Sequence, residues 1–301
     1  MRIGISICSS YTVDDPREGA RNMVARARAA RQADLDTLFV GDHHVTPSPY
    51  FQNVPMLGRM LAEWGDKPAG ALFLLPLWNP VLLAEQIGTL ASIAQGPFIM
   101  QCGLGDDRQG VSMGNEPKQR APMFEAALEV MRTLWRGEEA TEDRFWNIQG
   151  ARISPLPPEP VDVWVGSMAI PAINRTARLA EGWLASPGYT MAEAREGLNV
   201  YRQACAEHDR SPTAVAIRRD IFVATSSAEA KRVVDPYIQQ GYRGISADAL
   251  MYGSVSEVAE QIAAYEELGF TDIIVRNLSS NQAECLATIE CLAAVKAELA
   301  G

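Results

Sequence analysis

Eight strand-like apolar segments alternate with helical patterns along the chain, and this alternation restricts the fold more than any other feature. The segments span 2–8, 37–41, 69–75, 98–104, 161–167, 182–186, 216–225 and 271–277. Several are continuous apolar runs, which is typical of parallel strands buried on both faces. Eight strand–helix units in 301 residues predict an α/β protein, a (β/α)8 TIM barrel that forms one domain over 1–301. The runner-up is a doubly wound open sheet, but its Gly-x-Gly-x-x-Gly fingerprint does not follow the first strand.

Two connections are too long for a minimal barrel, and we interpret them as insertions at its C-terminal face. They cover about 106–118 and 137–160. Long excursions from a compact domain often serve as lids or partner surfaces.

Net charge and cysteine usage indicate which partners and which cell compartment to expect. The formal net charge of −10 argues against nucleic acid or an anionic membrane surface as the main partner. No secretory signal and no apolar run long enough to cross a bilayer are visible. The five cysteines are scattered without a Cys-x-x-Cys motif, so we expect reduced thiols in a cytoplasmic protein.

The stretch DTLFVGDHHVTPSP, residues 36–49, places Asp42, His43 and His44 where a predicted strand ends. In a barrel the chemistry lies at the C-terminal ends of the strands, and histidine exchanges protons near neutral pH. The alternative is a structural pair that hydrogen-bonds loop carbonyls. A metal site is disfavoured because adjacent residues of an extended chain point to opposite faces, and we predict none.

Other strand ends supply further candidates. Gly103 and Gly105 would let a ligand approach the backbone closely, while Asp106 is either a helix cap or a proton donor. Gly166 and Ser167 precede a predicted helix, whose free N–H groups favour an anion. Arg276, at the end of the last strand, could add positive charge to the same region.

Several motifs, in this order, carry a resemblance to a known family. They are Asp42-His43-His44, LLPLWNPVLLAEQIGTLASIAQGPF (74–98), CGLGD (102–106), MRTLWRGEE (131–139), PVDVWVGSMAIPAINRTARLAEGW (160–183) and GSVSEVAEQIAAYEELGFTDIIVRN (253–277). Together they resemble the bacterial luciferase-like family of flavin- and deazaflavin-dependent oxidoreductases. No single motif is specific, but their order and spacing are.

The resemblance implies a flavin-like ring, from coenzyme F-420 or FMN, at the C-terminal face of the barrel. His43 matches a catalytic acid/base, and Asp106 matches a catalytic carboxylate of some deazaflavin members. A bulge with a non-proline cis peptide is implied at Gly70-Ala71-Leu72, and a phosphate loop at Gly166-Ser167. The candidate cofactor-binding residues are Asp42, Gly70, Ala71, Leu72, Gly103, Gly105, Gly166, Ser167, Met168 and Arg276.

Departures from the family pattern favour coenzyme F-420 over FMN. Gly96-Pro97 replaces the usual Gly-Arg, and Gly103 and Leu104 replace a cysteine and a phosphate-binding arginine. We therefore expect hydride transfer between coenzyme F-420 and a small organic substrate, with His43 as acid/base. The alternatives are an FMN-dependent monooxygenase served by a separate reductase, a non-catalytic flavin-binding relative, and a metal-dependent hydrolase barrel. The resemblance also implies a homodimer.

Overall fold

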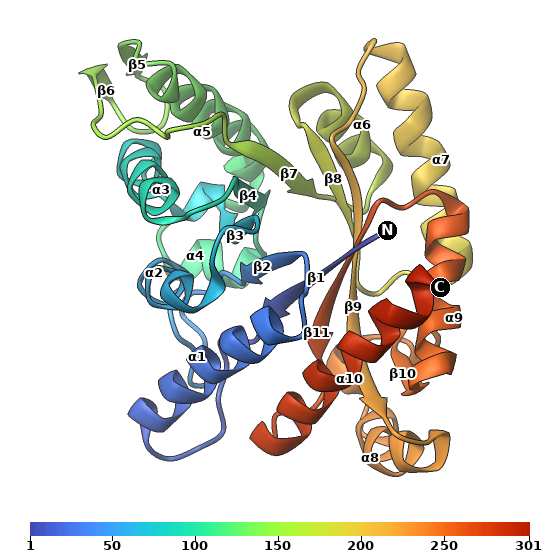
Figure 1. The fold of residues 1–301 in the computed structure, drawn as a ribbon. Coiled ribbons are helices and arrows are strands. Elements are labelled where there is room, and N and C mark those ends of the chain that lie inside the picture. The colour runs from blue at the N-terminus through green and yellow to red at the C-terminus, as the bar shows by residue number, and fades with distance from the viewer.

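Eight parallel strands close into a barrel in the computed structural model, which describes residues 1–301 (Figure 1). Their order is β1, β2, β3, β4, β7, β8, β9 and β11, and β11 pairs with β1 to complete the circle. These strands are β1 (Arg2–Ile7), β2 (Thr37–Val40), β3 (Ala69–Leu74), β4 (Phe98–Gly103), β7 (Asp162–Gly166), β8 (Gly182–Ala185), β9 (Ala214–Ala224) and β11 (Asp272–Asn277). The predicted (β/α)8 barrel is confirmed, and each strand begins and ends within two residues of its predicted segment.

Helices surround the barrel and carry readable start signals. They are α1 (Pro16–Gln32), α2 (Asn53–Trp64), α3 (Pro80–Ile93), α4 (Asp107–Ser112), α5 (Arg120–Trp135), α6 (Ile170–Leu179), α7 (Met191–Glu207), α8 (Ser227–Gln239), α9 (Val255–Leu268) and α10 (Gln282–Ala300), with short 3-10 helices at Leu75–Leu77, Pro117–Gln119, Tyr242–Gly244 and Ala247–Ala249. Asp15 and Asn79 each cap a helix that starts with proline, and Thr190 and Ser254 form full capping boxes. None of these helices has the length and apolar character needed to cross a bilayer.

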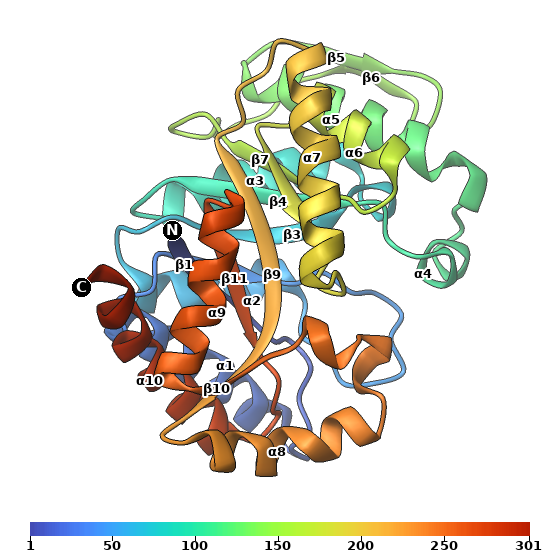
Figure 2. The same ribbon diagram turned by 90° about the vertical axis from the view of Figure 1, so that its right-hand side faces the viewer.

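The two long connections take different forms. The first contains α4, which lies on the side of the molecule away from both chain termini (Figure 2). The second contains an antiparallel hairpin of β5 (Ala140–Glu142) and β6 (Ile148–Ala151), which lies near α5 (Figure 1).

Side chains of the barrel strands alternate between the helix layer and the barrel interior. Ile3, Ile5 and Ile7 of β1 belong to the large core cluster that includes the helices. A smaller buried cluster takes inward positions from five strands, two of them from β9: Phe39, Ile99, Trp164, Ala214, Ala216 and Ile274. This cluster closes the barrel interior. Residues two to four positions further along the same faces therefore point into the space above it.

Strand β9 is longer than its neighbours and serves two partners. Its residues 216–221 pair with β11, whereas residues 221–224 pair with β10 (Met251–Ser254), which lies outside the barrel circle. The middle of β9, and not its end, therefore lies beside the C-terminal end of β11.

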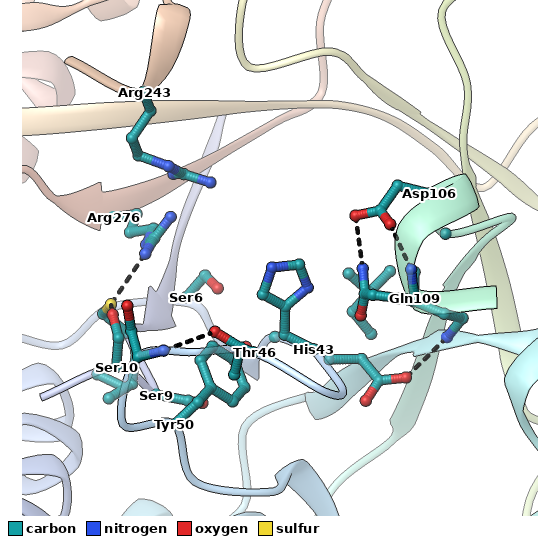
Figure 3. Close-up of a pocket in the computed structure, with 18 of the residues that line it drawn as sticks. Ser6, Ser9, Ser10, His43, Thr46, Tyr50, Asp106, Gln109, Arg243 and Arg276 are labelled. Carbon is teal, nitrogen blue, oxygen red and sulfur yellow. Dashed lines mark hydrogen bonds between the residues drawn. The ribbon is translucent and has the colours of Figure 1, made fainter. Parts of the chain in front are cut away.

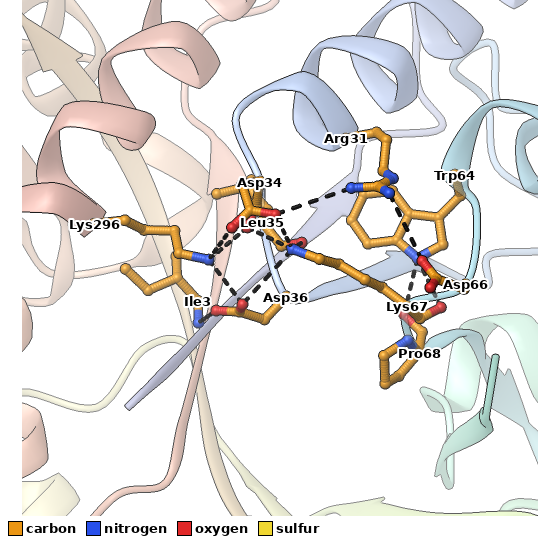
Figure 4. A network of polar contacts seen from close by, with 10 residues as sticks. All are labelled: Ile3, Arg31, Asp34, Leu35, Asp36, Trp64, Asp66, Lys67, Pro68 and Lys296. Carbon is orange, nitrogen blue, oxygen red and sulfur yellow. Dashed lines mark hydrogen bonds and ion pairs between the residues drawn. The ribbon is translucent and has the colours of Figure 1, made fainter. Parts of the chain in front are cut away.

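A polar network fastens the opposite end of the barrel, where β1 begins (Figure 4). Lys67 donates through Nζ to the backbone oxygens of Asp34 and Leu35 at 2.8 and 2.9 Å. Lys296 of α10 donates to Asp36 Oδ1 at 2.7 Å, and Asp36 Oδ2 accepts from the Ile3 backbone N–H at 2.7 Å. These contacts join the turn before β2, the turn before β3, strand β1 and the last helix, so we assign this network to stability.

Candidate active site

A cavity of about 480 Å³ opens at the C-terminal ends of β1, β2, β3, β4 and β11, beside the middle of β9. Six of the residues selected from the sequence line it: Asp42, His43, Leu72, Gly105, Asp106 and Arg276. The other six do not line it: Gly70, Ala71, Gly103, Gly166, Ser167 and Met168. In a close view His43 lies between two arginines on one side and Asp106 with Gln109 on the other (Figure 3).

The adjacent histidines have different surroundings, as strand geometry predicts. His43 continues the inward face of Phe39 and lines the cavity. His44 lies away from it, with Nε2 3.0 Å from Asp42 Oδ1 and its ring edge against Trp78. The other oxygen of Asp42, Oδ2, accepts from the Leu74 N–H and from Trp78 Nε1, both at 2.8 Å. Asp42 and His44 therefore hold the strand end, and His43 is left for the cavity.

The electrostatics of His43 favour the neutral imidazole. Burial lowers its pKa below the ordinary 6.5, and the charge of Arg108 acts in the same direction, while Asp106 opposes them. A neutral ring at pH 7 can accept a proton.

Asp106 forms a helix cap that also faces the cavity. Its Oδ1 accepts from the Gln109 backbone N–H, and its Oδ2 accepts from Gln109 Nε2, both at 2.8 Å. Although burial opposes it, these bonds and the charges of Arg108 and His43 lower the pKa of Asp106. Asp106 is therefore ionised near neutral pH, which favours the cap over the proton donor.

Gln109 was not anticipated from the sequence. It is buried, and its side chain also accepts, through Oε1, from the His44 backbone N–H at 2.7 Å. It thereby connects the α4 segment with the histidine strand end.

The region of Gly70, Ala71 and Leu72 corrects one expectation from the resemblance. Strand β3 pairs with β4 in unbroken register, and the cis peptide bond of the chain is Ser154–Pro155. The Ala71 side chain belongs to the helix-side core cluster and does not line the cavity. Gly70 points inward below the cavity, where a Cβ atom would lie 1.8 Å from the Ile99 carbonyl oxygen. Only Leu72 contributes to the cavity wall.

The β7 end lies outside the cavity and is partly occupied by internal contacts. Ser167 Oγ is 2.9 Å from Thr176 Oγ1, and the Ser167 carbonyl accepts from Trp183 Nε1 at 3.1 Å. Met168 is exposed, and no side chain caps the first turn of α6. A phosphate role for Gly166, Ser167 and Met168 stays a prediction.

Cys8 lines the cavity as well, although no sequence motif pointed to it. It follows Gly4 and Ser6 on the inward face of β1. Its Sγ accepts from Arg276 Nη2 at 2.9 Å and lies 3.0 Å from Ser10 Oγ. Burial opposes ionisation, but the Arg276 charge and the bonds with Arg276 and Ser10 lower the pKa of the Cys8 thiol to about 7.

Alkylation of Cys8 by iodoacetamide is expected to reach half its maximal rate near pH 7, because the thiolate is the nucleophile. In an Arg276→Gln variant the midpoint should rise above the ordinary value of 9.0, since burial then acts without the cation. Peptide mass spectrometry gives each rate. Cys291, whose pKa is raised by burial, serves as the internal reference. Equal midpoints for Cys8 in the two proteins would contradict the role of Arg276.

Comparison with known proteins places this geometry in a family. A model of the luciferase-like monooxygenase family matches residues 1–249. The chain is 24% identical to an F-420-dependent glucose-6-phosphate dehydrogenase of Intrasporangium calvum, covering 89% of this chain and 92% of that one. It is 25% identical to the enzyme of the same name from Beutenbergia cavernae, covering 92% and 93%.

Solved structures agree on the fold. Monooxygenase RslO1 from Streptomyces bottropensis superposes with a TM-score of 0.86 at 16% identity over 100% of both chains. An F-420-dependent secondary alcohol dehydrogenase, in complex with an F-420-acetone adduct, gives 0.81 at 14% identity over 98% of both. The oxygenating constituent of 3,6-diketocamphane monooxygenase from Pseudomonas putida, in complex with FMN, gives 0.81 at 18% identity over 97% of both.

The matched model covers most of the chain, and the barrel carries its acid/base candidate at the C-terminal face. The chain therefore belongs to the luciferase-like monooxygenase family, a family of oxidoreductases that use coenzyme F-420 or FMN.

Proposed function

We propose that this enzyme transfers a hydride between coenzyme F-420 and a small organic substrate that carries a hydroxyl group, with His43 as the proton acceptor. The observation that carries the proposal is the His43 ring, which faces the cavity with a lowered pKa. The names of the curated relatives, F-420-dependent dehydrogenases, support the choice of cofactor and of reaction.

The cavity fits a flavin-type ring. Its volume of about 480 Å³ lies within the range of small-molecule sites, roughly 300–1,000 Å³. Leu72 and Leu74 give it an apolar wall from β3, against which a flat ring would pack. When bound, the deazaflavin supplies the hydride acceptor.

The residues of the chain then take up the proton that the reaction releases and hold the proton acceptor in place. Oxidation of a hydroxyl-bearing carbon releases a hydride from C–H and a proton from O–H as the carbonyl forms. His43, neutral at pH 7, accepts the proton, and the nearby carboxylate of Asp106 stabilises the resulting imidazolium. Asp42, His44 and Gln109 hold the peptide around His43 in place.

Paired titrations with coenzyme F-420 and FMN test the proposal. We expect micromolar binding of coenzyme F-420 and much weaker binding of FMN, followed by the change in cofactor fluorescence on mixing. Tight binding of FMN alone would point to monooxygenation, and binding of neither cofactor would overturn the proposed function. His43→Asn protein should keep similar affinities, because asparagine removes proton transfer but keeps a polar side chain at this position of the cavity wall.

A further inference from the structure

Three arginines from separate segments meet at one side of the cavity. Arg218 of β9 and Arg276 of β11 follow Ala216 and Ile274 on the inward faces of their strands, and both line the cavity. Arg243 reaches the same wall from the 3-10 turn Tyr242–Gly244 (Figure 3). We call these three residues the arginine cluster.

One buried carboxylate is shared by the whole cluster. Asp220, with a fully buried side chain, has Oδ2 2.9 Å from Arg243 Nη1 and 3.9 Å from Arg276 Nη1. Its Oδ1 lies 3.2 Å from Arg218 Nε. Three positive charges against one negative charge leave a surplus of two, or of one when Cys8 is ionised. Surplus charge of one sign in a concave, partly buried site focuses the field on ligands of the opposite sign.

Most donors of the cluster are unused within the protein. A guanidinium carries five N–H donors. Arg218 donates no hydrogen bond within the protein, and its Nε has only the Asp220 oxygen nearby, at 3.2 Å. Burial and the repulsion of Arg276 and Arg243 lower the pKa of Arg218 to about 10, which still leaves it charged.

The neighbouring Arg219 provides a comparison, because its guanidinium is used only for contacts within the protein. It points to the other face, is almost fully buried, and donates to Tyr265 Oη and to the carbonyl oxygens of Pro187 and Tyr189 at 2.6–3.0 Å. The donors of Arg219 are engaged by the protein, whereas Arg218 lines the cavity with no hydrogen bond within the protein.

The turn that carries Arg243 has an unfavourable backbone. Arg243 has φ 50° between two glycines, Gly241 and Gly244, with φ 74° and 68°. A left-handed conformation costs a non-glycine residue free energy and persists only where surroundings or function maintain it. Here it brings the third guanidinium to Asp220 and the cavity.

We propose that the arginine cluster binds an anionic group of the substrate, a phosphate, carboxylate or sulfonate, while the reacting carbon lies toward His43. This assignment rests on the proposed function, because it names the substrate class of the same site. Guanidinium groups bind such oxyanions in bidentate fashion, with charge-assisted hydrogen bonds. The cluster and the His43 ring line one cavity, so a small molecule can reach both.

Calorimetric titration with inorganic phosphate tests the proposal, using enzyme already loaded with the cofactor that it binds. We expect the affinity for phosphate to fall at least about tenfold in Arg218→Gln, the loss of one charge-assisted contact, and to be partly restored in Arg218→Lys. Arg232→Gln removes an exposed arginine of α8 and the same net charge, so its affinity should equal that of the unmodified enzyme. Circular dichroism confirms that each variant is folded.

The loading step separates a substrate anion from an anion of the cofactor. Phosphate binding that persists beside the bound cofactor supports the substrate site. Phosphate binding that disappears on loading, or cofactor affinity that falls with Arg218→Gln, would assign the cluster to the cofactor and overturn the proposal. Equal phosphate affinities in Arg218→Gln and Arg232→Gln would also overturn it. If neither cofactor binds, the proposed function fails, and the comparison of variants is made on the unloaded protein.

Discussion

Replacing His43 with asparagine is expected to lower kcat by about 10²–10⁴-fold, the range that a positioned acid/base group contributes. The asparagine side chain occupies about the space of the inner part of the histidine side chain, but it cannot take up a proton near neutral pH. The strand end should keep its shape, because Asp42 and His44 make the contacts that fix it. Steady-state turnover with the cofactor identified by titration is the measurement.

The pH profile gives a second, more specific readout of the same substitution. Because burial lowers the pKa of His43 below 6.5, the rate in the proton-accepting direction should be flat around pH 7. It should fall only at more acidic pH, as the ring becomes protonated. His43→Asn should lose this acidic limb together with the rate.

His208→Asn is the matched control, because His208 is exposed at the end of α7. Its turnover and pH profile should match those of the unmodified enzyme. Turnover of His43→Asn at the level of this control would remove His43 from the mechanism.

The fold could be predicted because each local pattern agreed with the closed barrel. Eight buried strand segments, separated by helices with proline and capping-box starts, leave few compact arrangements. What the sequence could not show is that β9 passes beyond the barrel to pair with β10, since that pairing depends on a connection of more than twenty residues.

The site could be predicted where a strand end and the alternation of faces agreed. His43 satisfies both conditions. Ala71 was selected from the family resemblance alone, without regard to the alternation of side chains along the strand. Its side chain lies on the outer face, one residue away from an inward position. The same rule would have selected Cys8, because Ile3, Ile5 and Ile7 mark the outer face of β1 and leave Gly4, Ser6 and Cys8 inward.

The arginine cluster depends on tertiary structure in a way that local patterns do not reveal. The sequence predicts that the strand which became β9 ends at 225, whereas Arg218 lines the cavity from the middle of β9 and Asp220 is buried beside it. Arg243 arrives from a turn after α8, held by two glycines with positive φ. Only the closed barrel brings these residues to Arg276.

Asp220→Asn is expected to destabilise the enzyme by about 3–5 kcal/mol, the usual cost of leaving buried charge without its partner. Burial opposes ionisation of Asp220, but Arg218, Arg276 and Arg243 lower its pKa. A depressed carboxyl pKa stabilises the fold above the unfolded pKa, near 3.9, and this contribution disappears as the pH falls through the lower folded value. Urea unfolding at pH 7 measures the loss, and the difference between variant and parent should shrink below about pH 4.

Asp235→Asn removes an exposed carboxylate of α8 and serves as the control, with little expected change in the free energy of unfolding.

Asp220→Asn, compared with Asp235→Asn, also tests the arginine cluster, by raising its positive charge and not lowering it. Without Asp220 the surplus of positive charge grows by one, so inorganic phosphate should raise the stability of Asp220→Asn more than that of Asp235→Asn. Adding Arg218→Gln to Asp220→Asn should recover part of the lost stability and remove part of the extra phosphate effect, because both arise from the same uncompensated guanidinium groups. Equal responses of Asp220→Asn and Asp235→Asn to urea and phosphate would show that the carboxylate does not balance the cluster.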